Sequence, residues 1–202
     1  MAMAKRANTT VISALNQDSM ITGNKVILRD KSLSDVRNDY AWQTDPELAF
    51  LDATMTMDVS FAEYLLDYAQ QIRNTNHASR RFAVTTLEGK LIGNCSYYHI
   101  DEASGEAEVG IMIGDRDYWD KGYGTDAVIA LLDYIFRQTD LRRVYLKTLD
   151  WNLRAQRCFQ KSGFSTYGYR QQDGNNFVLM EMTRPQWQKL NQTTDKSGAR
   201  ES

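Results

Sequence analysis

A glycine-containing turn between an expected strand and an expected helix is the segment of this sequence best suited to chemistry. It reads Asp120-Lys121-Gly122-Tyr123-Gly124-Thr125, and it follows EAEVGIMIG and opens the helical stretch TDAVIALLDYIFRQ. The first N–H groups of a helix have no partner within the helix and lie at the positive end of its dipole, so they attract anions. Glycine lets a phosphate approach the backbone closely. The turn therefore predicts a phosphate site, although similar glycine turns also occur in ordinary strand–helix connections.

Two well-known phosphate-binding motifs do not explain this turn. The P-loop motif GxxxxGK[ST] needs an earlier glycine, and none precedes Gly122 at the required spacing. The dinucleotide fingerprint GxGxxG would place its third glycine at Ala127, and because a GxGxxA form exists this test is weak. The order of elements is more informative, since the fingerprint opens a parallel strand–helix–strand unit at the first strand. Here antiparallel-looking strands come first, which disfavours a nicotinamide-dependent enzyme.

Two segments together resemble the GNAT superfamily of N-acetyltransferases. Its signature [QR]-x-x-G-x-[GA] is met by Gly122 and Gly124, whereas Trp119 stands at the Gln/Arg position. The stretch Tyr118–Ala127 looks like the branch that contains ribosomal-protein N-terminal and spermidine acetyltransferases. A second family segment, N-x-x-A-x-x-x-[YF]-x-x-x-G-F, is matched by Asn152, Ala155, Phe159, Gly163 and Phe164. The resemblance covers Lys25 to Trp187 and implies an acyltransferase that uses acetyl-CoA and no metal.

The resemblance also implies which residues bind acetyl-CoA. The turn would hold the pyrophosphate, and the strand around Ile111–Ile113 would pair with the pantetheine arm as an added strand does. Asn152 would bond the pantetheine chain, with a helix N-cap as its other role, and Arg157 would reach the phosphates unless it is an ordinary surface arginine. The expected set is Ile111, Met112, Ile113, Trp119, Asp120, Lys121, Gly122, Tyr123, Gly124, Thr125, Asn152, Ala155, Arg157 and Phe159.

Acetyl transfer to an amine needs a base, because only about one alkylammonium group in a thousand is deprotonated at pH 7. The resemblance implies that Glu108, on the strand before the turn, is this base and acts through water. Glu106 shares its face in a regular strand and is the second candidate. Many family members place a tyrosine acid where this chain has Phe159. The thiolate therefore leaves unaided, or Cys158 or Tyr123 donates the proton instead.

The acceptor side is less defined by the sequence. Aromatic side chains suit cations and sugars alike, and the expected candidates are Tyr40, Trp42 and Tyr98, with Phe50, Tyr97, His99 and Tyr169 behind them. Carboxylates that a polyamine would need lie at Asp39, Asp45, Glu47 and Asp52, where they could equally form a solvated helix face. A polyamine, a protein N-terminal amine and another small amine all stay open. The alternatives are an amino sugar or nucleotide sugar as acceptor, or a CoA-binding module without catalysis.

The elements that must position these residues follow from periodicity. Helices are expected from Ser32 to Trp42, after an N-cap at Ser60, along the stretch after Gly124 and over Leu153–Lys161. Strands flank them, with hairpins at Glu88-Gly89 and Asp173-Gly174. The pattern predicts an α+β (mixed α/β) fold and not a doubly wound sheet. The resemblance implies a mostly antiparallel twisted sheet of about six or seven strands with about four flanking helices, as in the GNAT fold.

Composition sets the wider limits. The chain has 202 residues and a net charge of −2, which argues against a broad nucleic-acid-binding face. Its two cysteines do not make a disulfide framework, and it has no apolar run long enough for a membrane span. We expect a flexible arm at 1–24, one domain at 25–190 and a disordered tail at 191–202. The simplest expected location is the cytoplasm. A homodimer that forms through sheet edges is compatible with the sequence.

Overall fold

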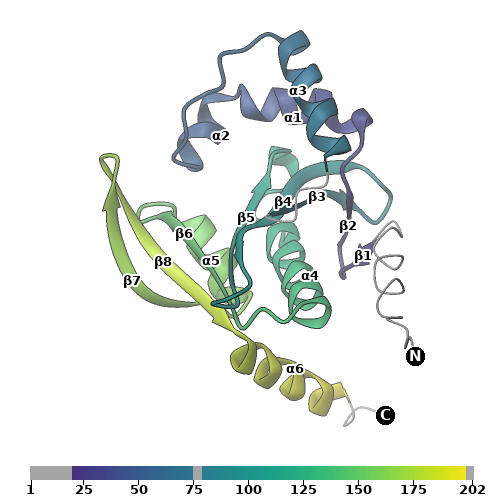
Figure 1. Ribbon diagram of the computed structural model, residues 1–202. Helices are drawn as coiled ribbons and strands as arrows, with labels where there is room; N and C mark the ends of the chain where they lie inside the picture. The colour runs from purple at the N-terminus through teal and green to yellow at the C-terminus, as the bar shows by residue number, and fades with distance from the viewer. Residues whose placement is uncertain (1–19, 75–78, 199–202) are drawn as a thin grey trace, which may run out of the picture.

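A computed structural model describes residues 20–74 and 79–198 of the chain, which contain one central sheet (Figure 1). Its eight strands lie in the order β1-β2-β3-β4-β5-β6-β8-β7. Every neighbouring pair is antiparallel except β5 and β6, which are parallel. The strands are β1 (Ile21–Thr22), β2 (Val26–Asp30), β3 (Ser79–Thr86), β4 (Leu91–Asp101), β5 (Glu106–Ile113), β6 (Arg143–Leu149), β7 (Ser165–Gln172) and β8 (Asn175–Thr183). The mixed, mostly antiparallel fold is confirmed, with eight strands in place of six or seven.

Six α-helices surround the sheet in the described residues, where about four were expected. They are α1 (Val36–Gln43), α2 (Pro46–Leu51), α3 (Phe61–Arg73), α4 (Tyr123–Gln138), α5 (Leu153–Lys161) and α6 (Arg184–Gly198), with short 3₁₀ turns at Leu33–Asp35 and Arg116–Tyr118. The bounds of α5 agree with its predicted range. The sequence did carry a signal for the unpredicted α2, because Pro46 is its first residue and the Asp45 carboxylate caps the N–H groups of Glu47 and Leu48.

Both expected domain boundaries differ from the elements observed. The strand β1 takes up Ile21 and Thr22, which were assigned to a flexible arm, and it pairs with Leu28 and Ile27 of β2. At the other end, α6 continues to Gly198, past the start of the expected tail at Asn191. The rest of the predicted arm, residues 1–19, and the last residues 199–202 lie outside the described residues.

The core lies between α4 and the sheet. Figure 1 shows α4 crossing behind the strands, and its buried face presents Ala127, Leu131 and Ile135. These side chains pack in one apolar cluster with sheet residues such as Leu28 and Phe82. Burial of this stripe stabilises the helix far more than its intrinsic propensity does. The start of α4, and with it the glycine turn, is therefore fixed relative to β5.

The parallel pair β5–β6 is short and then divides. Partners are matched only at Glu106↔Arg143, Ala107↔Val144 and Glu108↔Tyr145. Beyond Glu108, β5 runs on to Ile113 paired with β4 alone. Figure 1 shows the blade made by β6, β8 and β7 diverging from the blade made by β1–β5. One edge of β5 is consequently left without a strand partner in the middle of the sheet.

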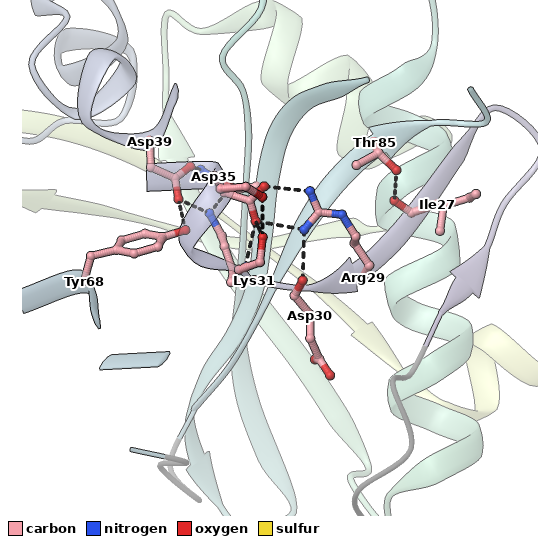
Figure 2. Close-up of polar contacts among 11 residues, drawn as sticks. Ile27, Arg29, Asp30, Lys31, Asp35, Asp39, Tyr68 and Thr85 are labelled. Atoms are coloured by element: carbon pink, nitrogen blue, oxygen red, sulfur yellow. Dashed lines mark hydrogen bonds and ion pairs between the residues drawn. The ribbon is translucent and has the colours of Figure 1, made fainter. Parts of the chain in front are cut away.

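A buried polar cluster attaches α1 and α3 to the sheet (Figure 2). Asp39 accepts a hydrogen bond from the Tyr68 hydroxyl at 2.7 Å and one from the Asn94 amide at 2.8 Å, and it also contacts the Lys31 ammonium. Burial lowers the pKa of Lys31, and the neighbouring Asp39 carboxylate partly opposes this shift. Beside it, Arg29 makes a two-bonded ion pair with Asp35 at 2.6 and 2.8 Å. Every member is paired, so the cluster fixes how the helices sit on β2 and β4.

Removing the Tyr68 hydroxyl should weaken this attachment. A hydrogen bond to a charged group contributes about 1.5–3 kcal/mol, so Tyr68→Phe should lower the free energy of unfolding in urea by about that amount. The matched control is Tyr169→Phe on β7, where the side chain is 78% exposed and a change within about 0.5 kcal/mol is expected. Equal stabilities of the two variants would show that the cluster does not hold the helices.

Candidate active site

A cleft of about 710 Å³ occupies the place where β5 and β6 diverge. Its walls are the far half of β5, the turn before α4, one face of α5, the end of α2 and the tip of the β7–β8 hairpin. Fourteen of the predicted site residues line it, namely Tyr98, Glu108, Ile111, Met112, Ile113, Trp119, Asp120, Gly122, Gly124, Thr125, Asn152, Ala155, Arg157 and Phe159. Lys121, Tyr123, Tyr40 and Trp42 are not among the lining residues. The fold thus brings the two sequence motifs side by side in the wall of one cleft.

The glycine turn has the geometry of an anion site. Gly122 precedes α4 with φ +83°, a left-handed conformation that L-residues adopt only with strain. The first bond of the helix runs from the Asp126 N–H to the Gly122 carbonyl at 3.0 Å, so the N–H groups before it lack intrahelical partners. The Lys25 ammonium donates to the Lys121 carbonyl at 3.0 Å, which places a positive charge beside the turn.

The turn is held from below by a buried carboxylate. Asp126, 7% exposed, accepts backbone hydrogen bonds from Asn24, Lys25 and Val26 at 3.1, 2.7 and 3.1 Å. This anchor joins the start of β2 to the first turn of α4. The residues between β1 and β2 are therefore part of the structure that supports the anion site.

Trp119 has a defined place although it departs from the family signature. Its indole N–H donates to the Ile113 carbonyl at 2.6 Å, which ties the turn to the end of β5. The Arg154 guanidinium lies 3.5 Å from the centroid of its ring, a cation–π contact that holds the arginine in the cleft wall. Arg154 was not predicted from the sequence. Its signal would have been its position two residues after Asn152, which puts it on the same first turn of α5.

Phe159, Cys158 and Tyr123, the residues considered for the leaving group, have different surroundings. Phe159 is 6% exposed and packs edge-on against Phe164, so it is a wall residue. Cys158 lines the cleft, and its sulfur accepts a hydrogen bond from the Thr125 hydroxyl at 3.6 Å. Burial raises the pKa of the Cys158 thiol, which keeps it protonated at neutral pH. Tyr123 instead packs against Tyr118.

Asn152 caps α5 and also lines the cleft. Its side-chain carbonyl accepts the Ala155 N–H at 3.1 Å, which is an N-cap of α5. Its amide donates to the Leu51 carbonyl at 3.4 Å and so links α5 to the end of α2, while the residue lines the cleft.

The two candidate bases have different surroundings. Glu108 lines the cleft, its side chain is 13% exposed, and its carboxylate lies 3.1 Å from the His99 imidazole. Burial and the neighbouring Glu108 carboxylate raise the pKa of the Tyr98 hydroxyl, which hydrogen-bonds to Glu108. Glu106 lies outside the cleft lining and is paired with Arg143 at 3.0 Å. Of the two carboxylates, only that of Glu108 faces the cleft, and that of Glu106 is held by a cation outside its lining.

The aromatic residues expected on the first helix do not reach the cleft. The Tyr40 hydroxyl donates to the Val59 carbonyl at 2.9 Å and its ring packs on Phe61, so it binds α1 to α3. Trp42 is 8% exposed and lies against the backbone of Gly114, where a Cβ atom would come within 2.2 Å of the indole. Both side chains are used in packing, and only Tyr98 of the three acceptor candidates lines the cleft.

One of the four carboxylates considered for an amine site faces the cleft. Asp39 belongs to the buried polar cluster, while Asp45 and Glu47 pair with Arg116 at 2.8 and 2.7 Å. Asp52, just after α2, lines the cleft. The surrounding protein desolvates its carboxyl group and raises the pKa of Asp52 to about 6, against the attraction of Lys147, although the side chain keeps solvent contact through the open cleft.

The hairpin tip is the part of the cleft that the sequence did not reveal. Gln172, Asp173 and Asn175 line the cleft together with Lys147 of β6. The Asp173-Gly174 turn was predicted, but its position depends on the pairing of β8 with β6, which no local pattern encodes. Among the described residues no group of three His, Cys, Asp or Glu side chains is arranged to hold a metal ion.

The divided parallel pair and the glycine turn at the start of α4 together offer a free strand edge and an anion site, which suit an extended ligand that carries phosphate. The chain belongs to the GNAT acetyltransferase family, because the family description "Acetyltransferase (GNAT) domain" matches residues 25–165. It is thus an acetyl-CoA-dependent N-acetyltransferase. In the part of the chain that the structure describes, no helix has the length and apolar character of a membrane span.

Individual relatives agree with this assignment. The chain is 28% identical over 145 residues to the uncharacterised N-acetyltransferase p20 of Bacillus licheniformis, covering 71% of this chain and 81% of the relative. It is 27% identical over 100 residues to the spermine/spermidine N(1)-acetyltransferase of Bacillus subtilis, covering 47% of this chain and 66% of that one. The fold matches the Vibrio cholerae spermidine N-acetyltransferase, solved with CoA and spermine, at a TM-score of 0.71 and 22% identity over 80% of this chain and 97% of that one.

A bulky side chain at Gly122 should abolish acetyl-CoA binding. Wild-type protein should gain about 2.7 kcal/mol of stability at acetyl-CoA near 100 times Kd, and Gly122→Trp should lose this gain in thermal unfolding. Gly89→Trp is the matched control, since Gly89 has a similar φ of +88° in an open turn with nothing near its Cβ position. Both variants should lose a similar free energy of unfolding, about 1–2 kcal/mol, because each places a non-glycine residue at positive φ. A ligand-induced shift that survives in Gly122→Trp would exclude the turn as the pyrophosphate site.

Proposed function

We propose that the chain acetylates a primary amine of a small acceptor with more than one positive charge, by direct attack in a ternary complex. The observation that carries the proposal is the joint position of Glu108 and Asp52, two carboxylates that line the same cleft as the glycine turn. One carboxylate can receive the reacting ammonium group and the other a second positive charge. The Bacillus subtilis relative is named for spermine and spermidine, and the Vibrio cholerae spermidine N-acetyltransferase was solved with spermine bound.

The described residues fit the acetyl donor. The turn at Gly122 offers unpaired N–H groups to a pyrophosphate, and Arg154 and Arg157 in the same cleft offer positive charge. The free edge of β5 around Ile111–Met112 can pair with the amide groups of a pantetheine arm. The bound donor would supply an activated acyl carbon at the division of β5 and β6. A Cβ atom at Gly124 would lie 3.4 Å from the Cys158 sulfur, an ordinary van der Waals contact, so the start of α4 packs against α5 beside the site.

Glu108 takes the proton that the acceptor must lose. The carboxylate is largely shielded from solvent and oriented by Tyr98 and His99, so it can accept a proton from the ammonium group directly or through one water. Backbone N–H groups of β5 that lack a strand partner can stabilise the negative oxygen formed at the acyl carbon. The Cys158 thiol lines the cleft and can donate a proton to the leaving thiolate, although a thiolate with a pKa of about 8.5 places little demand on a donor.

Asp52 and Tyr98 define the acceptor side. The Asp52 carboxylate is close enough to raise the pKa of the Tyr98 hydroxyl, after the larger effects of burial and of Glu108. The Tyr98 hydroxyl is therefore near both carboxylates. A cation extended along this wall would contact Glu108 at one amino group, the Tyr98 ring in its middle and Asp52 at the next charge. The amide side chains of Gln172 and Asn175 at the rim can add hydrogen bonds.

Replacing the base should remove turnover but keep donor binding. Glu108→Gln should lower kcat with spermine by about 10²–10⁴-fold, the usual contribution of general-base catalysis. Thiol release with acetyl-CoA measures it, and thermal unfolding checks that acetyl-CoA still binds. Glu106→Gln, two residues away on the same strand face, is the matched variant and should lose less than about fivefold, since its carboxylate is occupied by Arg143.

Other results would change the assignment. A larger loss in Glu106→Gln than in Glu108→Gln would exchange their roles. Acetyl-CoA binding without thiol release on any amine would identify a CoA-binding module, and turnover of amino sugars but not of spermine would favour a sugar acceptor.

Acceptor affinity should follow the ionisation of Asp52. Its pKa of about 6 is raised, so the carboxyl is neutral below that pH, and the affinity for spermine should increase as pH rises through about 6. Spermine itself stays charged over this interval, with amine pKa values near 10. Asp52→Asn should flatten this rise and weaken Kd by about fivefold at pH 7.5, since a partly solvated ion pair contributes about 1 kcal/mol.

Calorimetric titration of spermine into CoA-saturated protein measures this effect. Asp150→Asn, an exposed carboxylate outside the cleft lining, is the control and should keep the wild-type curve. A pH dependence that is the same in wild type and Asp52→Asn would exclude Asp52 from the acceptor site.

A further inference from the structure

His99 has the least favourable backbone conformation of the residues around Glu108. It lies on β4 with φ +50°, a left-handed value that is uncommon for residues other than glycine. The pairing of β4 with β5 is irregular there, shifting between Tyr98 and Asp101. Such strained residues persist where the surrounding structure imposes them, and they concentrate at functional sites. In this conformation the imidazole contacts Glu108 of β5.

The imidazole connects the shielded base with bulk water. Its Nδ1 lies 3.1 Å from Oε2 of Glu108, and the ring packs edge-on against Tyr98 at 4.9 Å between centroids. The His99 side chain is 71% exposed, while that of Glu108 is 13% exposed. The histidine therefore has one nitrogen on the carboxylate and the rest of its ring in solvent.

We propose that His99 carries the substrate proton from Glu108 to solvent, an inference that rests on the proposed function. The overall reaction, R–NH₃⁺ + acetyl-CoA → R–NH–CO–CH₃ + CoA-SH + H⁺, releases one proton for each acetyl group transferred. The N–C bond forms and the C–S bond breaks, and one of the two protons lost by nitrogen ends on the thiolate. The other is held by Glu108 and must leave before the next cycle.

His99 has the position and chemistry to remove it. Nδ1 of the neutral imidazole accepts the proton from the Glu108 carboxyl group, and Nε2 of the resulting imidazolium gives a proton to water. The exposed ring then re-equilibrates its tautomers with solvent. Without it, a proton on a carboxyl group that is 13% exposed has to leave through the acceptor cleft, which the bound product occupies.

The surrounding charges bear on the pH dependence of this step. Tyr98 on β4 and Tyr145 on β6 face Glu108, and the pKa of each hydroxyl is raised by burial and by that carboxylate. The Asp52 carboxylate also raises the pKa of the Tyr98 hydroxyl, by less than burial and Glu108 do. Arg143 is paired with Glu106 and Glu181 at 3.0 and 2.6 Å, so its charge is already balanced.

Two variants test the relay with acetyl-CoA and spermine as substrates. His99→Asn keeps a residue that tolerates positive φ but does not titrate, and His99→Gly removes the strain and opens space for imidazole. Each should lower kcat at pH 7 by about tenfold, less than loss of the base itself because water partly replaces the relay. The deficit should shrink as pH rises, since more acceptor arrives deprotonated. Added imidazole should restore His99→Gly.

The controls separate a relay from a structural role. Glu102→Gln, an exposed charge in the following turn, should leave kcat and its pH profile unchanged. Wild-type kcat in both histidine variants overturns the proposal, and so does a deficit that neither imidazole nor pH alters. A wild-type protein that binds acetyl-CoA but acetylates no amine would instead refute the proposed function. If the wild type is active and both histidine variants keep its kcat, only the relay is refuted.

Discussion

The division of β5 from β6 is the constraint on which the rest of the structure depends. Parallel strands need a crossover connection, here α4, and this connection places a helix start at the carboxyl end of β5. Because the two strands pair only from Glu106 to Glu108, the same end of β5 has a free backbone edge beside that helix start. One feature of the sheet thereby creates both an edge for an extended chain and a site for a phosphate. Glu108, the proposed base, is the last residue of β5 that pairs with β6.

Buried polar groups hold the walls of this cleft in place. Asp126 joins the start of β2 to α4 below the glycine turn, and Asp39 with Lys31 attaches α1 and α3 to the sheet. Different surroundings also give different properties to side chains of the same type. Glu106 is neutralised by Arg143, while Glu108 two residues later opens into the cleft beside Tyr98. Each carboxylate has a structural or a chemical role according to the cation or hydroxyl group that faces it.

Prediction from the sequence succeeded where the signal was local. The turn residues, the α5 bounds and the Asp173-Gly174 hairpin each depend on a few neighbouring residues, and the structure has them where expected. The strand and helix counts were too low, because β1 is a two-residue strand that its pairing with β2 defines and α2 is a single short helix that begins at Pro46. Tyr40 and Trp42 were expected at the acceptor side and instead pack against α3 and Gly114. Helical periodicity shows which face is apolar but not which neighbour covers it.

The sequence by itself determined the resemblance to the family, most of the longer strands and helices and the glycine turn, because these follow from residue spacing along short stretches. Only the tertiary structure decided which side chains share the cleft. The hairpin tip, Asp52 and Arg154 come from segments far apart in the chain, and their meeting depends on the strand order β5-β6-β8-β7 and on the divergence of two strands. The tertiary structure also distinguishes Glu106 from Glu108. Arg143 on β6 neutralises Glu106, whereas His99 on β4 contacts Glu108.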